Sequence, residues 1–344
     1  MKRTAALLIL LSVLLSGCSS QRPEQGGTAQ YTATFLDLFD TLTTIIGRAE
    51  SEEEFRKSAQ SIHDELLRYH RLFDIYQEYE GMNNLCTINK NAGVAPVRAD
   101  GQIIALLQDC RSYYEATGGM VNAAMGSVLR LWHDARDAGA ADPANAYLPD
   151  EQALREAQAH VSFDAVEIDP EAGTVFLSDP AASLDVGAIA KGWAVQRVCE
   201  GAPEGMLISV GGNVCATGPK DENGTPWVIG IQDPDGAADK YLHTIYLSEG
   251  SVITSGDYQR AYLVDGVPYH HIIDPQTCYP ASLWRSVSVV CADSALGDML
   301  STALFLLPQE EGQALLEQYG AQALWVSPEG ELLYSPGFSE LIRT

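Results

Sequence analysis

The stretch TSGDYQRAYLVDGVPYHHIIDPQT, residues 254–277, decides the fold of the carboxyl-terminal half of this chain. Apolar residues recur on both sides of Asp265-Gly266, a dipeptide typical of a two-residue β-hairpin turn. The pattern predicts two strands, the second carrying His270 and His271 and ending at Asp274. A proton-transferring imidazole and a carboxylate are thus expected at one strand end. A plain hairpin with a surface histidine pair would show the same pattern.

Outward from this stretch, short strands bounded by Gly, Asp or Pro dominate from Met206 onward. Helical spacing of apolar residues predicts helices elsewhere, over residues 51–79, 100–117, 150–159 and 294–307. A strand hairpin is predicted over 165–177 and a loop over 134–150. The fold class is therefore predicted as α+β, with helices clustered N-terminally, mostly antiparallel strands C-terminally and two intertwined lobes.

The first residues have the pattern of an export signal. Lys2 and Arg3 precede a short apolar run, which ends in Leu-Ser-Gly-Cys at residues 15–18. This ending resembles a bacterial lipobox, which implies that Cys18 is lipidated and anchors the protein to the outer face of a membrane. Residues 1–18 are then the signal, 19–30 a flexible tether and 31–344 the folded domain. The alternative is an ordinary secreted protein with an incidental Cys18.

The overall charge excludes one class of function. The formal net charge is −25, and such an acidic chain lacks the basic footprint of a nucleic-acid-binding protein. An anionic ligand would need a locally built site with a cation. The cysteines after Cys18 lack the spacing of a metal site and are interpreted mostly as small core residues, namely Cys86, Cys110, Cys199, Cys215, Cys278 and Cys291.

Three further segments have the composition of ligand-binding sites. LDVGAIAKGW, residues 184–193, predicts a loop entering a helix, with Lys191 available to a phosphate. ISVGGNVCATG, residues 208–218, predicts a strand and a glycine turn that is either close to a cofactor or a simple hairpin. In residues 295–305, Asp298 and Thr302 fall on one helical face, where their oxygens suit Mg²⁺. Each segment alone is also typical of an ordinary helix end or turn.

Together these segments resemble the FAD:protein FMN transferases, the ApbE-type flavin transferases, from about residue 39 to 330. The resemblance is carried by five blocks in order: D-x-G-x-I-A-K-G at 185–192, G-G-N at 211–213, S-G-x-Y-x-R at 255–260, H-I-I-D-P-x-T at 271–277 and D-x-x-x-T-A-L-F at 298–305. It implies an ApbE-like, T-fold-related structure. The chain departs from the usual pattern at Val121-Asn122, Ala124, Cys278 and Gly297.

The resemblance implies transfer of FMN from FAD to a Ser or Thr hydroxyl of another protein, with Mg²⁺ as cofactor and AMP as product. It implies that Mg²⁺ is bound by Asp298, Thr302 and the Ala188 carbonyl, and that His271 is the base. Asp274 either orients His271 or caps the turn. The residues implied to contact FAD are Tyr76, Met120, Val121, Asn122, Asp185, Lys191, Ser255, Gly256 and Ile272.

Two other functions would use nearly the same site. In one, water replaces the acceptor and the protein is an FAD pyrophosphatase; in the other, it is a lipoprotein that binds FAD without turnover. The resemblance implies acceptors with a Ser/Thr-Gly-Ala-Ser/Thr-like motif, such as redox-pump subunits or extracellular flavin reductases. The remaining histidines are interpreted as structural or exposed, namely His63, His70, His133, His160 and His243.

Overall fold

A central antiparallel sheet organises the protein. The computed structural model describes residues 28–237 and 240–344; the predicted signal and nearly all of the predicted tether lie outside the described residues. Within these ranges the largest sheet has eight strands in the order β1-β2-β6-β7-β10-β13-β14-β15. They are β1 (Ala29–Leu38), β2 (Thr41–Ala49), β6 (Leu207–Val210), β7 (Asn213–Ala216), β10 (Gly250–Gly256), β13 (Ser286–Cys291), β14 (Gln322–Val326) and β15 (Leu332–Tyr334). The α+β prediction is confirmed.

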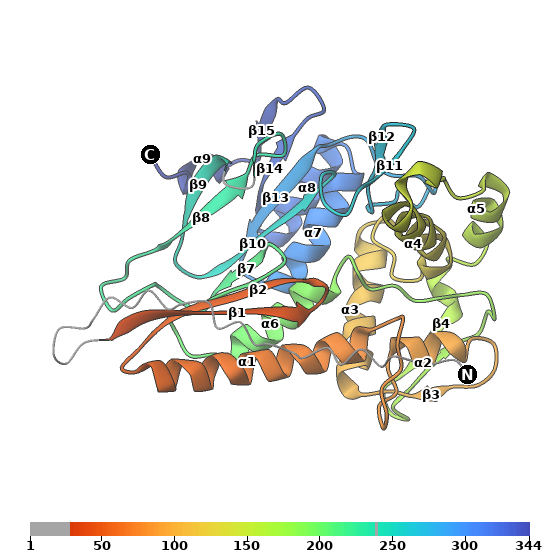
Figure 1. The fold of residues 1–344 in the computed structure, drawn as a ribbon, viewed down its shortest axis with the longest axis horizontal. Coiled ribbons are helices and arrows are strands. Elements are labelled where there is room, and N and C mark those ends of the chain that lie inside the picture. Colours follow the sequence, from red (N-terminus) through yellow and green to blue (C-terminus); the bar gives the residue numbers. More distant parts are fainter. Residues whose placement is uncertain (1–27, 238–239) are drawn as a thin grey trace, which may run out of the picture.

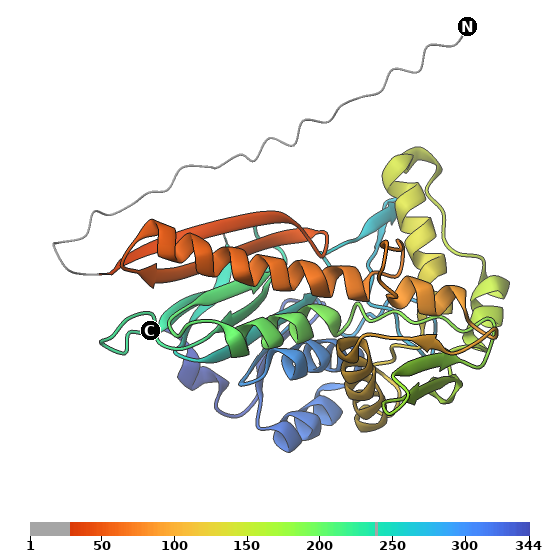
Figure 2. The same ribbon diagram turned by 90° about the horizontal axis from the view of Figure 1, so that it is seen from below.

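Different layers cover the two faces of this sheet (Figure 1). One face packs on helices, namely α1 (Glu52–Phe73), α6 (Ala190–Gly201) and α7 (Ser294–Leu306), with α8 (Gln309–Tyr319) beside α7. Figure 2 shows α1 and α6 side by side beneath the sheet. The other face is covered by a hairpin and a short helix, namely β8 (Trp227–Gln232), β9 (Tyr241–Leu247) and α9 (Phe338–Leu341). The predicted helix over 294–307 is confirmed.

A second lobe lies beside the sheet and is drawn on the right of Figure 1. Its elements are α2 (Leu85–Lys90), β3 (Val97–Arg98), α3 (Gly101–Ala116), α4 (Gly126–Ala141), a 3-10 turn (Pro143–Asn145), α5 (Glu151–Gln158), another 3-10 turn (Phe163–Ala165), β4 (Val166–Asp169), β5 (Thr174–Leu177), β11 (Tyr262–Val264) and β12 (Val267–Tyr269). Helices α4 and α5 and the β11–β12 hairpin share a separate small core around Trp132, Tyr262 and Ile273. The chain therefore crosses between the lobes more than once.

The hairpin around Asp265-Gly266 is confirmed. Tyr262 pairs with Tyr269, and both turn residues have positive φ, 51° and 80°, as this tight turn requires. The second strand is shorter than predicted. It ends at Tyr269, so His270 to Asp274 form a loop, not a strand.

Three other segments differ from the sequence prediction. Helix α1 ends at Phe73, because the Asp74 carboxylate accepts the Tyr76 and Gln77 amides and bends the chain into a turn. The predicted loop 134–150 begins with helix, since its alanines favour the last turns of α4. The β1–β2 hairpin was not predicted, although Tyr31, Ala33 and Phe35 alternate toward the core. Strand β1 begins at Ala29, inside the last two residues of the predicted tether.

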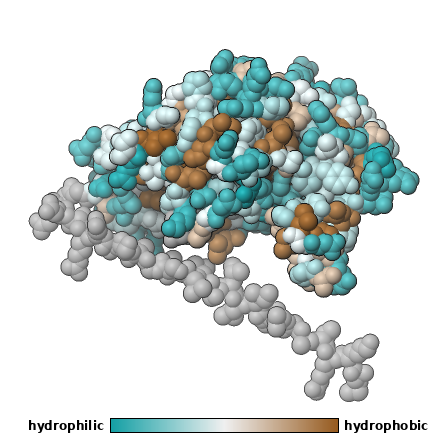
Figure 3. Space-filling view, turned by 90° about the horizontal axis from the view of Figure 1, so that it is seen from above, coloured by the Kyte–Doolittle hydropathy of each residue, from teal (hydrophilic) through white to brown (hydrophobic). Residues whose placement is uncertain are grey.

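The surface mixes hydrophilic and hydrophobic side chains. In Figure 3 separate hydrophobic patches lie among hydrophilic residues on the face seen from above. Within the described part of the chain, no helix combines the length and the apolar character needed to cross a bilayer. All the cysteines in that part are free thiols.

Candidate active site

The N-terminus of α6 meets the middle of α7 at one glycine. The Gly192 amide donates a 2.8 Å hydrogen bond to Oδ2 of Asp298, whose side chain is buried. A Cβ at this position would lie 2.3 Å from the Ser294 carbonyl oxygen and 2.4 Å from the Asp298 Cβ. Only glycine allows this approach, so the K-G pair of the predicted site sets the spacing of the two helices. The carboxylate satisfies an otherwise open amide of the helix start.

Three oxygens around this contact have no hydrogen-bond partner among the described residues: Oδ1 of Asp298, Oγ1 of Thr302 and the Ala188 carbonyl oxygen. The Ala188 oxygen lacks its helical partner because the Gly192 amide turns to Asp298 instead. A carboxylate, a hydroxyl and a carbonyl are the oxygen donors that Mg²⁺ prefers. The donor chemistry therefore fits the magnesium ion implied by the resemblance. No cluster of three His, Cys, Asp or Glu side chains able to hold a metal occurs in the described ranges.

Lys191 adds positive charge at the same place. Its Nζ donates to the Gly187 carbonyl oxygen at 3.2 Å and lies 3.7 Å from Oδ2 of Asp298. The ammonium group is thus held over the loop that precedes α6. In a protein of net charge −25, this local cation is what an anionic ligand requires.

Strand β10 reaches the same helix from the other side. The hydroxyls of Ser255 and Ser301 lie 2.9 Å apart, and Ser301 donates to the Asp298 carbonyl oxygen at 3.0 Å. These two hydrogen bonds fix the helical turn that carries Asp298. Gly256 comes next on the strand, and a Cβ there would lie 2.4 Å from the Tyr258 ring. Ser255 is therefore linked through Ser301 to the backbone of Asp298, and Gly256 makes room for the Tyr258 ring.

His271 is partly buried in the loop after β12. Its Nδ1 lies 3.1 Å from the Gln259 carbonyl oxygen, which can only accept, so the proton is on Nδ1. Nε2 is left as a lone-pair acceptor, with no hydrogen-bond partner in the described part of the protein. Burial, then the charges of Arg260 and Lys191, lower the pKa of His271 from 6.5 to about 3. The imidazole is therefore neutral near pH 7.

The neighbours of His271 support the loop. His270 is buried, with Nε2 2.8 Å from the Ala281 carbonyl oxygen and Nδ1 accepting from the Ile272 amide. Ile272 itself is buried. The Asp274 carboxylate accepts the Gln276 amide at 2.7 Å, a turn-capping bond. Of the two roles considered for Asp274, the geometry favours the cap.

Cys278 closes this loop with a positive φ of 60°, the conformation that a glycine adopts most easily. The strained residue is held on both sides. Its amide donates to the Asp274 carbonyl oxygen at 2.8 Å, and its own carbonyl oxygen accepts the Trp132 indole N–H at 2.9 Å. These two hydrogen bonds fix the backbone of the turn at Cys278.

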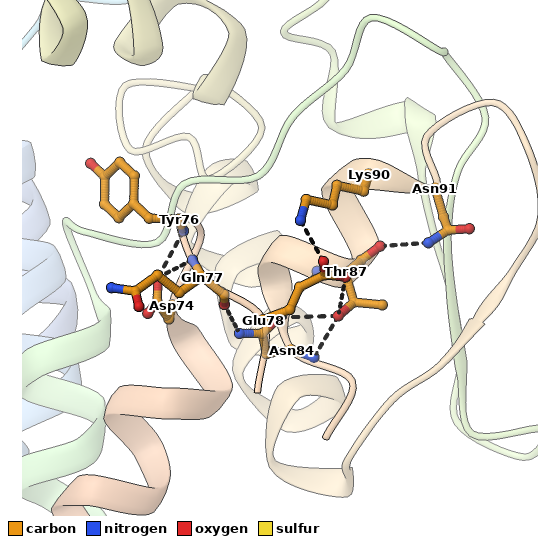
Figure 4. A network of polar contacts seen from close by, with 8 residues as sticks. All are labelled: Asp74, Tyr76, Gln77, Glu78, Asn84, Thr87, Lys90 and Asn91. Carbon is orange, nitrogen blue, oxygen red and sulfur yellow. Dashed lines mark hydrogen bonds and ion pairs between the residues drawn. The ribbon is translucent and has the colours of Figure 1, made fainter. Parts of the chain in front are cut away.

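Tyr76 is presented by a network of polar contacts in the loop after α1 (Figure 4). Asp74 accepts the Tyr76 and Gln77 amides, and the Asn84 amide group donates to the Gln77 carbonyl oxygen at 2.6 Å. Asn84 also caps α2. In Figure 4 the Tyr76 ring points away from this network, and the residue is 58% exposed. The network thereby holds the loop while the Tyr76 side chain remains accessible to a ligand.

Asp185 and Tyr76 both approach His133, which the sequence did not indicate as a site residue. The Tyr76 hydroxyl lies 2.7 Å from Nδ1 of His133, and Nε2 of His133 lies 3.7 Å from Oδ2 of Asp185. Oδ1 of Asp185 accepts the Gly187 amide at 2.9 Å. His133, interpreted from the sequence as structural or exposed, lies between these two residues on α4, in the part of the helix (126–133) that the sequence analysis assigned to no element. A correct helix assignment would have placed it beside Trp132 on α4.

One small cavity joins His133 to His271. Its lining is cationic and aromatic: Leu129, Trp132, His133, Arg136, Arg260, Tyr262, Tyr269, His270 and His271. Arg260 has a positive φ of 49° and donates to the Phe39 carbonyl oxygen at the tip of the β1–β2 hairpin. Parts of the chain far apart in sequence thus converge on one positively charged hollow.

The segment 120–122 lies at the edge of this region. The Asn122 side chain is used within the protein, donating to the Val161 carbonyl oxygen and accepting the Ala124 amide. Val121 is buried in the core. Met120 is partly exposed, and its sulfur lies 3.7 Å from the Gln276 amide nitrogen. Among these residues, Met120 is the one whose side chain faces the histidine loop. The Gly211-Gly212 turn is a β6–β7 hairpin packed on Thr41 of β2.

Comparison with known proteins gives a consistent result. The family model described as "ApbE family" matches residues 38–325. The FAD:protein FMN transferase of Treponema pallidum is 35% identical over 279 residues, which cover 75% of each chain. A protein of the same name from Klebsiella pneumoniae is 31% identical, covering 79% of this chain and 86% of the relative.

Solved structures agree with this match. The crystal structure of the ApbE protein from Thermotoga maritima superposes with a TM-score of 0.80 at 30% identity, covering 92% of this chain and all of that one. The flavin transferase ApbE from Vibrio cholerae, at 22% identity, shares the fold with a TM-score of 0.76 over 92% of this chain and all of that one. On these grounds, the chain described here belongs to the ApbE family.

Proposed function

We propose that this protein transfers FMN from FAD to a Ser or Thr hydroxyl of an acceptor protein, with Mg²⁺ as cofactor and AMP as product. The observation that carries the proposal is the state of His271. Its Nδ1 is tied to the Gln259 carbonyl oxygen, and its Nε2 is an open acceptor in a cationic cavity. Family membership and the names of the relatives support the flavin part of the proposal.

The chemistry is a phosphoryl transfer. The acceptor hydroxyl oxygen attacks the phosphorus on the FMN side of the FAD pyrophosphate, and the bond to the bridging oxygen breaks. The hydroxyl proton passes to Nε2 of His271, and the electron pair of the broken bond leaves with AMP. Lys191 offsets the charge that develops on the phosphates. A bound Mg²⁺, held by Asp298, Thr302 and the Ala188 carbonyl, would supply further neutralisation of that charge.

The low pKa of His271 belongs to the protein without FAD. Arg260 and Lys191 oppose protonation of the imidazole. An FAD pyrophosphate beside these two cations would offset their charge and raise the pKa of His271 toward the range where a base works best. The base would thus gain strength when the substrate is present.

The proposal extends to location and partners. The lipobox resemblance at Cys18 supports an extracytoplasmic protein anchored by lipid to the outer face of a bacterial membrane. Its acceptors would be exposed on that side, for example redox-pump subunits or extracellular flavin reductases with a Ser/Thr-Gly-Ala-Ser/Thr-like motif.

The test uses the soluble protein without residues 1–18. It is incubated with FAD, Mg²⁺ and an acceptor bearing that motif, with and without EDTA, and followed by intact mass and nucleotide chromatography. An FMN-sized mass on the acceptor with an equal amount of AMP, both lost with EDTA, is the expected result. Free FMN and AMP without an adduct would indicate hydrolysis, and bound FAD without AMP would indicate storage.

A further inference from the structure

Three residues from distant parts of the chain form one bridge across the proposed FAD site. Tyr76 lies in the loop after α1, His133 on α4 and Asp185 in the loop before α6. His133 is in the middle, 2.7 Å from the Tyr76 hydroxyl and 3.7 Å from the Asp185 carboxylate. The imidazole is therefore the shared contact of two residues that the family resemblance assigns to FAD.

Helix α4 is locked to the Asp185 loop, which fixes where His133 stands. The Gly126 amide donates to the Ser183 carbonyl oxygen at 2.9 Å, and the Asp185 amide donates to the Ala123 carbonyl oxygen at 2.8 Å. A Cβ at Gly126 would lie 2.5 Å from the Ser183 oxygen, so this contact depends on glycine. His133 lies about two helical turns further along, because seven residues span about two turns.

The protonation state of the bridge follows from its surroundings. Burial lowers the pKa of His133, while Asp185 acts in the opposite direction and more weakly. The ring is thus neutral near pH 7 and has one acceptor nitrogen. With Nδ1 accepting the Tyr76 hydroxyl, the Nε2 proton points toward Asp185. Each neighbour is oriented by a different side of one ring.

We propose that His133 is a positioning residue for FAD: it holds Tyr76 and Asp185 in the arrangement that binds the flavin nucleotide, and takes no part in removing the proton from the acceptor hydroxyl. This inference rests on the proposed use of FAD as substrate. The two histidines of the cavity thus have different roles. His271 has an Nε2 without a partner among the described residues, whereas both ring nitrogens of His133 face protein groups.

The test compares two replacements of the same residue. His133→Phe keeps a ring and loses both nitrogens, and should raise the Kd for FAD about tenfold, the loss expected for one good hydrogen bond. His133→Asn offers an amide oxygen near the position of Nδ1 and should recover most of that affinity. FAD binding is measured by flavin fluorescence without acceptor, and melting temperatures report folding. His160→Phe is the matched control, since His160 pairs with a different, partly exposed carboxylate, that of Asp179.

A double-mutant cycle with Tyr76→Phe checks the bridge itself. If His133 acts through Tyr76, the double variant should bind FAD no more weakly than the weaker-binding of the two single variants. Additive losses, or unchanged FAD affinity in His133→Phe, would overturn the inference. So would a fall in kcat without a change in KM, because that result would make His133 a catalytic group.

The outcome can be told apart from failure of the proposed function. Wild-type protein that binds FAD but transfers no FMN would end the transferase proposal, while the binding results would still decide the role of His133. Wild-type protein that transfers FMN, combined with normal FAD affinity in His133→Phe, would end only the inference.

Discussion

The Gly192 amide donates its hydrogen to Oδ2 of Asp298, and this bond joins α6 to α7 at the proposed metal site. Gly192→Ala should therefore destabilise the fold by about 1–3 kcal/mol, because the added methyl would overlap the Ser294 carbonyl and Asp298. Thermal melting measures the loss. Gly201→Ala in the same helix is the control, since a Cβ there meets nothing within 4 Å. Equal melting temperatures for the two variants would contradict the close helix contact.

Asp298→Asn should raise the Mg²⁺ concentration needed for half-maximal transfer about tenfold or more, because the amide removes the negative charge from the oxygen set. The amide oxygen can still accept from Gly192, so folding should change little. Mg²⁺ titration of the initial rate gives the measurement. Asp293→Asn, which caps the start of the same helix through the Leu296 amide, serves as control. A normal Mg²⁺ requirement in Asp298→Asn would refute the metal assignment.

His271→Ala should lower kcat about 10²–10⁴-fold through loss of the base, with little change in the Kd for FAD. His270→Ala should instead lower stability, with a smaller effect on kcat. Its imidazole bonds both the Ala281 carbonyl oxygen and the Ile272 amide, so its loss should lower the melting temperature. Steady-state kinetics and melting curves of the two variants separate the roles. An active His271→Ala enzyme would remove His271 as the base.

The acidic limb of kcat/KM should lie well below pH 6.5, because kcat/KM reports the free enzyme and the pKa of His271 is lowered to about 3 there. The base is unprotonated above its pKa, so activity is kept at neutral pH and is lost only as the pH falls toward that value. Arg260→Gln removes a cation that opposes protonation, so the pKa of His271 and the limb should both move upward. A pH series compares it with Arg130→Gln, an exposed α4 residue. An unshifted limb in Arg260→Gln would exclude this charge as a cause.

Cys18→Ala should move the protein from the membrane fraction to the soluble fraction, because the proposed lipid is attached there. Fractionation of cells that express either form, followed by immunoblotting, is the measurement. Retention of Cys18→Ala on membranes that have been washed with high salt would argue against lipidation.

The sequence indicates which residue types make up the proposed site, but it indicates their local geometry less well. The blocks around Asp298 and His271 were recognisable because these residue types carry the chemistry whatever the backbone does. The positions of Asp274 and His270 were not predicted correctly, because the predicted strand was expected to continue to Asp274 whereas β12 ends at Tyr269. His133 was missed for a related reason. Its contacts with Tyr76 and Asp185 span 57 and 52 residues of sequence, and no local pattern records them.

The start of β1 at Ala29 has a consequence for which proteins this enzyme can reach. From Cys18 to Thr28 there are ten residues, since 28 − 18 = 10, and ten residues extend at most about 36 Å. A folded domain of this size is about 50 Å across, more than the tether can span. Under the proposed anchoring, the tether between the lipid and the folded domain is shorter than the domain itself. An acceptor hydroxyl that lies far above the bilayer would be out of reach, even if its sequence motif fits the site. The height of the hydroxyl above the membrane would therefore limit the choice of acceptor in addition to the motif.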